Sequence, residues 1–312
     1  MKYKSNYPHG IMFHHFHDLK YFKKSQGSIS SYQLKRIISK IGRKNIINAD
    51  EFLNLYLNKK LNKNHVCLTF DDGLKCQIDI ALPVLKKYNI KAFWFLYTSI
   101  FNKKFDYLEI FREFRHSFKT VDIFYEKFFL FISQQNIKIQ PKNLNLFIKN
   151  MNKKFPFYSK NDLKFRYYRD QVLKKKYIKI MMDMIKKSNF NIIKCKKKIY
   201  MDRNDLKKLK KDKQVIGLHS HSHPTNIDKL SIYKSKKEYK INKKYLEKLL
   251  KNKIISMSHP CGNYNLKILE ELQKLKLKIG FNSNIKKNQN YKIFHNYQIP
   301  REDHSNIINK YL

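Results

Sequence analysis

Short apolar runs alternate with longer amphipathic stretches in the first third and the last third of the chain. The apolar runs have the length of buried strands, and the stretches that follow several of them have the spacing of helices. We expect strands at 11–13, 66–70, 92–97, 215–218, 254–257 and 279–281, and helices at 78–88, 236–251 and 266–275. Strands that alternate with helices indicate βα units and therefore a parallel sheet.

The pattern changes between about 101 and 198, where aromatic residues follow helical spacing in segments such as 107–118 and 121–132. Stripes of Phe and Tyr at this spacing are typical of core packing between helices. Neither an internal repeat nor a linker rich in Gly and Ser marks a boundary. We therefore expect a single α/β domain over 1–312, with a helical insertion at about 101–198.

The composition adds a strong positive charge to this picture. Hydrophobic residues make up 42% of the chain, enough for a folded core, and 67 Lys and Arg against 24 Asp and Glu give a formal net charge of +43. Most of the charge comes from lysines scattered along the chain, whereas specific reading of bases favours arginine. We expect no specific nucleic-acid partner. The charge suits an anionic substrate and is compatible with peripheral contact with a membrane surface.

The cysteines and the amino terminus indicate the cellular compartment of the protein. Cys67, Cys76, Cys195 and Cys261 contain no C-x-x-C pair and are too sparse for a disulfide scaffold, which fits a reducing environment. The first ten residues lack the apolar core of a signal peptide, and no run of about 18 apolar residues occurs. We expect no transmembrane segment and a cytoplasmic location.

Two adjacent carboxylates, Asp71 and Asp72, follow the expected strand at 66–70, and Gly73 comes directly after them. One of them could simply cap the next helix, but a single cap explains a single Asp. In parallel α/β folds the carboxyl ends of the strands face the active site. Neighbouring carboxylates raise each other's pKa unless a cation intervenes, so the doublet favours a metal or acid–base site.

Three histidines at alternating positions, His219, His221 and His223, follow the expected strand at 215–218. Imidazole is a common ligand of zinc and related ions, and two histidines with one carboxylate form an open three-ligand site. Pro224 argues against a continuing helix, so the histidines meet through a turn. The spacing alone does not decide which two of the three bind.

Together, T-F-D-D-G at 69–73 and H-S-H-S-H-P at 219–224 resemble the polysaccharide deacetylase family, the carbohydrate esterases of the NodB homology type. The resemblance implies a distorted (β/α) barrel of about seven strands, which makes the expected domain a catalytic one. It also implies Asp71 as the general base and Asp72, His219 and His223 as ligands of a divalent metal, most simply zinc. His221 then lies outside the ligand set.

Three weaker similarities extend this assignment. The segment S-H-P-C-G-N-Y-N at 258–265 resembles the third family motif, which implies that the backbone N–H of Cys261 stabilises the oxyanion; Ser258 stands where the family has arginine. The segment I-P-R ending at Arg301 resembles a subgroup whose motifs are circularly reordered, and Arg301 is the candidate partner of Asp71.

The segment I-M-F-H at 11–14 resembles the strand that supplies the general acid in the same subgroup, so His14 is our candidate for that role. His15 is the nearest alternative and His17 a more distant one. Because side chains alternate along a strand, we expect His14 and His15 to point to opposite faces.

The function that the resemblance implies is hydrolysis of an N-acetyl group on a sugar, within a glycan or a phosphate-bearing glycan precursor. Two other classes share some of these features. One is a nonenzymatic basic binding protein on a degenerate deacetylase scaffold, which the intact set of Asp and His residues argues against. The other is a two-His-one-carboxylate iron oxygenase, which has no use for Asp71 and normally has the strand pattern of a β-sandwich.

Overall fold

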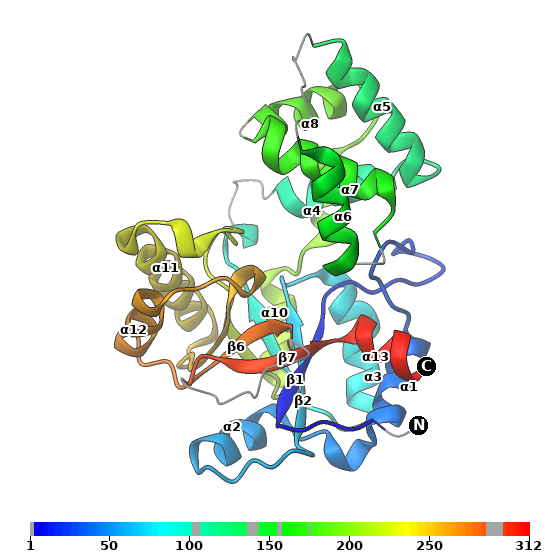
Figure 1. Ribbon diagram of the computed structural model, residues 1–312. Coiled ribbons are helices and arrows are strands. Elements are labelled where there is room, and N and C mark those ends of the chain that lie inside the picture. Colours follow the sequence, from blue (N-terminus) through cyan, green and yellow to red (C-terminus); the bar gives the residue numbers. More distant parts are fainter. Residues whose placement is uncertain (1–2, 102–106, 136–142, 155–157, 175, 285–295) are drawn as a thin grey trace. The chain divides into compact units, whose positions relative to one another are not determined.

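Seven parallel strands close into a barrel in the order in which they occur along the chain, with β7 paired to β1 (Figure 1). The structure is a computed structural model and describes residues 3–101, 107–135, 143–154, 158–174, 176–284 and 296–312. The strands are β1 His9–Phe13, β2 Val66–Asp71, β3 Phe93–Leu96, β4 Val215–Leu218, β5 Ser256–Ser258, β6 Ile279–Asn284 and β7 Ile299–Asp303. The closed parallel barrel confirms the predicted fold class.

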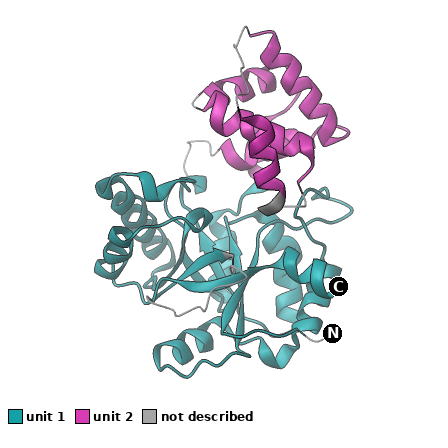
Figure 2. Cartoon of the chain, viewed as in Figure 1, with its two compact units in different colours: residues 1–105, 199–312 teal, residues 106–198 magenta. Residues whose placement is uncertain are grey.

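The chain forms two compact units, residues 1–105 with 199–312 and residues 106–198 (Figure 2). The first contains the barrel and the helices α1 Ser31–Ile41, α2 Ala49–Leu57, α3 Leu82–Lys87, α10 Arg203–Lys211, α11 Ile232–Leu250, α12 Leu266–Lys274 and α13 His304–Tyr311. That the two units act as one catalytic domain stays a prediction. None of the helices in the described ranges is long and apolar enough to cross a membrane.

The second unit is helical in its described parts. Its helices are α4 Tyr107–His116, α5 Val121–Ser133, α6 Leu144–Lys154, α7 Lys160–Tyr167, α8 Lys176–Lys186 and α9 Ile192–Ile199, the last of which ends at the border of the first unit. Phe124, Phe128 and Phe165 are fully buried and contact one another edge to face or stacked. The aromatic stripes of this region therefore form a core, as their spacing indicates.

The barrel strands agree closely with the apolar runs, and the main difference is β7. Its five residues include Pro300 and three charged residues, so it lacks the continuous apolar run that identifies a buried strand. Its register with β1 nevertheless places Arg301 opposite Gly10. The helix expected at 78–88 begins as a π-helix, Gln77–Ala81, before α3.

Aromatic side chains fill part of the barrel core. Phe93 and Phe95 of β3 pack against Phe281 of β6, and Phe52 of α2 contacts both Phe93 and Phe281. All four are fully buried, and burial of a Phe side chain contributes roughly 1.5–3 kcal/mol. Because β3 pairs with β2 and β4, and β6 pairs with β5 and β7, this packing holds the strands next to those that carry the polar residues described next.

Candidate active site

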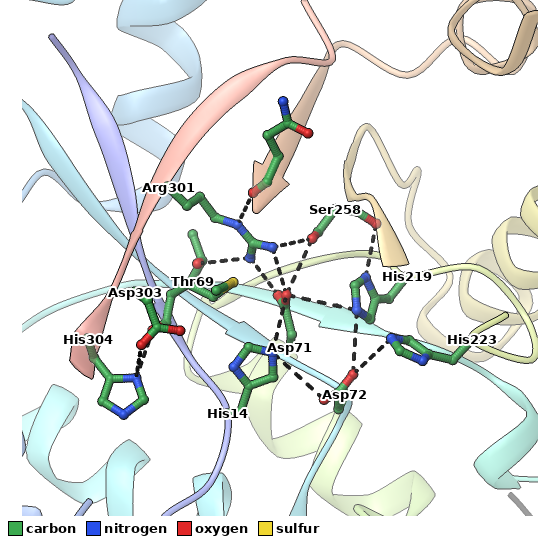
Figure 3. Close-up of polar contacts among 12 residues, drawn as sticks. His14, Thr69, Asp71, Asp72, His219, His223, Ser258, Arg301, Asp303 and His304 are labelled. Atoms are coloured by element: carbon green, nitrogen blue, oxygen red, sulfur yellow. Dashed lines mark hydrogen bonds and ion pairs between the residues drawn. The ribbon is translucent and has the colours of Figure 1, made fainter. Parts of the chain in front are cut away.

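A buried ion pair joins the end of β2 to the middle of β7. Arg301 Nη1 donates to Asp71 Oδ1 at 2.7 Å, and Arg301 Nη2 donates to Asp71 Oδ2 at 2.8 Å, so the pair is bidentate (Figure 3). Only 1% of Arg301 and 2% of Asp71 is exposed. The structure thus brings together the predicted base and its predicted partner, which are 230 positions apart in the sequence.

The remaining donors of Arg301 are also paired. Nη1 donates to Thr69 Oγ1 at 3.2 Å, Nη2 to Ser258 Oγ at 2.7 Å and Nε to the Asn282 carbonyl at 2.5 Å. Ser258 occupies the motif position where the family has arginine, and its hydroxyl accepts from an arginine of another strand. The guanidinium is therefore held rigidly against Asp71.

This pairing keeps Asp71 ionised. Burial raises the pKa of Asp71, but the positive charge of Arg301, with His219 close by, outweighs burial and holds that pKa below its ordinary value. A carboxylate in this state can accept a proton from a neighbouring group, which is what a general base requires.

Three side chains from the turn after β2 and from the loop after β4 converge beside this pair. His219 Nε2 lies 3.4 Å from Asp72 Oδ1, and His223 Nε2 lies 3.5 Å from the same oxygen (Figure 3). One ligand atom from each of these residues lies within 4.8 Å of the others. Burial raises the pKa of Asp72, but the nearby His219 and His223 hold it well below its usual range. We call Asp72, His219 and His223 the three-ligand site.

The three-ligand site fits a divalent metal. Asp72 Oδ1 is buried and has no hydrogen-bond partner among the described residues, although both imidazoles point toward it. The Ser258 carbonyl lies 2.9 Å from His219 Nδ1, so Nδ1 donates to that carbonyl and Nε2 is left to face Asp72. Two imidazole nitrogens and one carboxylate oxygen match the donor set of open zinc-type sites.

Four of the ten non-glycine residues with positive φ in the described part of the chain lie in or close in sequence to the predicted site residues. Asp72, Ser220, His223 and Cys261 all have positive φ angles, of 77°, 62°, 51° and 53°. Each such residue costs roughly 1–3 kcal/mol and persists only where its surroundings fix it, and strain of this kind gathers at functional sites. Two of the three predicted ligands are thus held in conformations that their side chains disfavour.

His14 reaches the same cluster from the end of β1. Its Nε2 lies 3.9 Å from Asp71 Oδ2 and 3.9 Å from Asp72 Oδ2, and 30% of its side chain is exposed. The expectation that His14 and His15 point to opposite faces is wrong, because β1 ends at Phe13 and strand alternation stops there. The two rings are stacked, with centroids 6.4 Å apart.

Cys261 and His221 are not part of the three-ligand site. Cys261 is exposed in a short 3-10 turn, Pro260–Gly262, directly beyond β5. His221 Nδ1 lies 2.9 Å from the Thr98 hydroxyl, and His221 is not part of the three-ligand site. The structure therefore separates His221 from His219 and His223, a choice that spacing alone leaves open.

Comparison with known proteins identifies the family. The family model described as polysaccharide deacetylase matches residues 58–122 and 169–280, which is more than half of the chain. The chain belongs to the polysaccharide deacetylase family. The matched residues include the three-ligand site, Asp71 and Cys261, whereas His14 and Arg301 lie outside them. No match was found among curated proteins.

Solved structures of deacetylases share the fold of this chain. The Streptococcus pyogenes deacetylase PplD in complex with acetate is 15% identical with a TM-score of 0.56, and the alignment covers 98% of each chain. IcaB from Ammonifex degensii is 14% identical with a TM-score of 0.56, over 97% of this chain and 93% of IcaB. The de-N-acetylase from Aggregatibacter actinomycetemcomitans is 15% identical with a TM-score of 0.53, over 97% and 98%. At these identities the likeness shows the fold.

Some residues that shape the candidate site are absent from the sequence-based prediction. Gln77 is fully buried, and its amide donates to the carbonyl of His14 at 2.8 Å and to that of Asp71 at 2.7 Å, which links the ends of β1 and β2. Asn242, on α11, plays a comparable part for the histidine loop. The signal for both is a polar residue at a position where a helix otherwise buries apolar side chains.

Proposed function

We propose that this chain is a metal-dependent carbohydrate N-deacetylase that hydrolyses the N-acetyl group of a sugar to acetate and a free amine. The observation that carries the proposal is the convergence of a buried, ionised Asp71 with the adjacent three-ligand site at one end of the barrel. Membership of the polysaccharide deacetylase family supports it. The parallel barrel differs from the β-sandwich expected for an iron oxygenase.

In this proposal the chain's own residues perform the proton transfers. Asp71 takes a proton from the attacking water, and Arg301 keeps the carboxylate ionised and oriented. His14, on the other side of the carboxylates, donates a proton to the departing amine. The backbone N–H of Cys261 donates to the oxyanion. Because 30% of the His14 side chain is exposed, that ring can exchange its proton with solvent.

Asp72, His219 and His223 would hold the divalent metal, for which zinc is our proposal. Bound there, such an ion supplies Lewis-acid polarisation of the amide and lowers the pKa of water. His219 is prepared for this role because its Nδ1 is bonded to the Ser258 carbonyl.

For the substrate we propose an N-acetylated sugar in a glycan or in a phosphate-bearing glycan precursor. The acetate in the S. pyogenes structure matches the product that this reaction would release. A precursor fits the proposed cytoplasmic location, and its phosphate fits the net charge of +43. We also propose that the chain belongs to the circularly reordered subgroup, since His14 lies at the end of β1 and Arg301 on β7.

Acetate release tests the proposal. We expect the Zn²⁺-supplemented protein to release acetate from at least one member of a panel of N-acetylated nucleotide sugars and glycan oligomers. Asp72→Ala should lose both metal and activity. Asp71→Asn should bind metal normally but lose about 10²–10⁴-fold in kcat, the usual contribution of a general base. Wild-type turnover by Asp71→Asn would exclude Asp71 as the base, and absence of release across the panel would contradict the proposed reaction.

A further inference from the structure

Two polar side chains on one face of α11 contact the loop that carries the histidines. Glu238 and Asn242 are one helical turn apart and therefore lie on the same side of the helix. Asn242 is fully buried and sits in the stripe that continues through Tyr239, Leu246 and Leu250. A buried amide in an apolar stripe is unfavourable unless its hydrogen-bonding groups are paired, so its partners indicate what it does.

Glu238 holds the middle of the loop. Its Oε2 accepts the backbone N–H groups of His221 at 2.9 Å and of Ser222 at 2.7 Å, and its Oε1 accepts the Ser222 hydroxyl at 2.8 Å. A carboxylate suits this position because it only accepts, and charge-assisted hydrogen bonds are stronger than neutral ones. The segment between the two predicted histidine ligands is thereby tied to α11.

Asn242 holds the beginning of the loop. Its Oδ1 accepts the backbone N–H of His219 at 3.0 Å, and its Nδ2 donates to the Leu96 carbonyl at 2.9 Å and to Thr98 Oγ1 at 3.3 Å. The same Thr98 hydroxyl contacts His221 Nδ1. One buried amide thus fixes the first predicted ligand relative to the end of β3.

The loop requires such support because Ser220 and His223 have left-handed backbone angles. Strained residues of this kind persist only where their surroundings fix them. We infer that Glu238 and Asn242 are positioning residues that set the metal affinity of the three-ligand site. The inference rests on the proposed function and deepens it, since neither side chain contacts a ligand atom of the site in the described structure.

The affinity of the full chain for Co²⁺ tests this inference. We expect Kd to rise by about ten- to a hundredfold in Glu238→Gln and in Asn242→Asp, the usual range for residues that orient metal ligands. Glu247→Gln is the matched control, because it removes the same charge from the same helix. Glu247 pairs with Lys243 and accepts the Ile254 N–H instead of contacting the loop. Circular dichroism and Tm of each variant show whether it is folded, and half-buried Glu238 tolerates substitution better than buried Asn242.

Rescue by metal separates this role from catalysis. Because Glu238 acts through metal occupancy, excess Zn²⁺ should restore kcat of Glu238→Gln toward the wild-type value, whereas Asp71→Asn should stay inactive. Equal Co²⁺ affinity of wild type, Glu238→Gln and Asn242→Asp would overturn the inference and leave the proposed function standing. An equal loss in Glu247→Gln would overturn it as well. If the wild type bound no Co²⁺ and released no acetate, both the proposed function and the inference about Glu238 and Asn242 would fail.

Discussion

The pair formed by Asp71 and Arg301 shows how strongly the stability of the protein depends on a single buried ion pair. Both side chains are almost completely buried, and removing one partner of such a pair leaves an uncompensated charge. We expect Arg301→Met to lower the free energy of unfolding by about 3–5 kcal/mol. The double variant Asp71→Asn with Arg301→Met should lose less than the sum of the two single variants. Urea unfolding of all four proteins gives this coupling, and strictly additive losses would contradict it.

His9, the first residue of β1, makes a pH-dependent contribution to stability. Burial lowers the pKa of His9 to about 4, and its Nδ1 contacts the Tyr7 carbonyl at 2.9 Å. In the unfolded chain its pKa is near 6.5, so between about pH 6.5 and 4 only the unfolded state binds this proton. His9 therefore does not lower the free energy of unfolding above about pH 6.5. As the pH falls from about 6.5 toward 4, the free energy of unfolding decreases by up to about 1.4 kcal/mol per pH unit.

His9→Gln removes the titrating group, so its unfolding free energy should depend less steeply on pH over that interval. Urea titrations at several pH values between 7 and 4 check this. The same slope in wild type and variant would mean that other groups titrate there.

At the level of individual residues, the sequence identifies groups that carry chemistry better than groups that position them. The doublet Asp71–Asp72 and the alternating histidines are visible because ionisable residues follow apolar runs. Arg301 could be named only through resemblance, since its place beside Asp71 depends on how the barrel closes. Gln77 and Asn242 were missed because their partners are backbone groups distant in sequence.

Among the strands, β4 depends on a glycine for close packing. A Cβ added at Gly217 would lie 2.6 Å from ring atoms of Phe95 and 2.7 Å from Ser256 Oγ. We expect Gly217→Ala to cost about 1–3 kcal/mol, as overpacked cores do. Phe95→Leu should relieve part of this cost in the double variant, because it removes the ring that the new methyl group meets. Thermal unfolding measures both, and a Gly217→Ala protein with unchanged Tm would contradict the packing argument.

The predictability of the elements follows from their chemistry. Apolar runs predicted six of the seven strands at overlapping positions, and 215–218 was predicted with the bounds that the structure has. β7 was missed because Pro300 and its charged residues remove the apolar signal, while its position is set by pairing with β1 and β6. α11 begins at Ile232 instead of 236 because Ser231 caps it by accepting the N–H of Lys234. Local capping of this kind is a weak signal within a lysine-rich run.

At the scale of the whole molecule, the second unit explains why the chain looked like a single domain with an insertion. Residues 106–198 leave and rejoin the barrel unit between β3 and β4, so the sequence of the barrel is interrupted without a linker of unusual composition. The aromatic core of the second unit follows from helical spacing. The compactness of the second unit does not follow from that spacing, because compactness depends on contacts between helices distant in sequence.

This division predicts a local response to metal removal. The three-ligand site lies entirely in the barrel unit, so bound metal should stabilise that unit, by about 2.7 kcal/mol when free metal is at 100 times Kd. Chelation should therefore lower the Tm of the barrel transition by about 5–10 °C, given about 2–4 °C per kcal/mol for domains of this size. Hydrogen exchange should show lost protection around the histidine loop, while amides of residues 107–135 keep theirs.

Asp72→Ala is the control, because it lacks one ligand and should respond little to the chelator. If protection fell uniformly across both units, the two units would unfold as one cooperative body. A bound ligand protects every amide whose exchange requires the same opening of the protein that releases the ligand. Loss confined to the barrel would instead assign the second unit its own stability. The same measurement therefore tests the metal site and decides whether the chain acts thermodynamically as one domain.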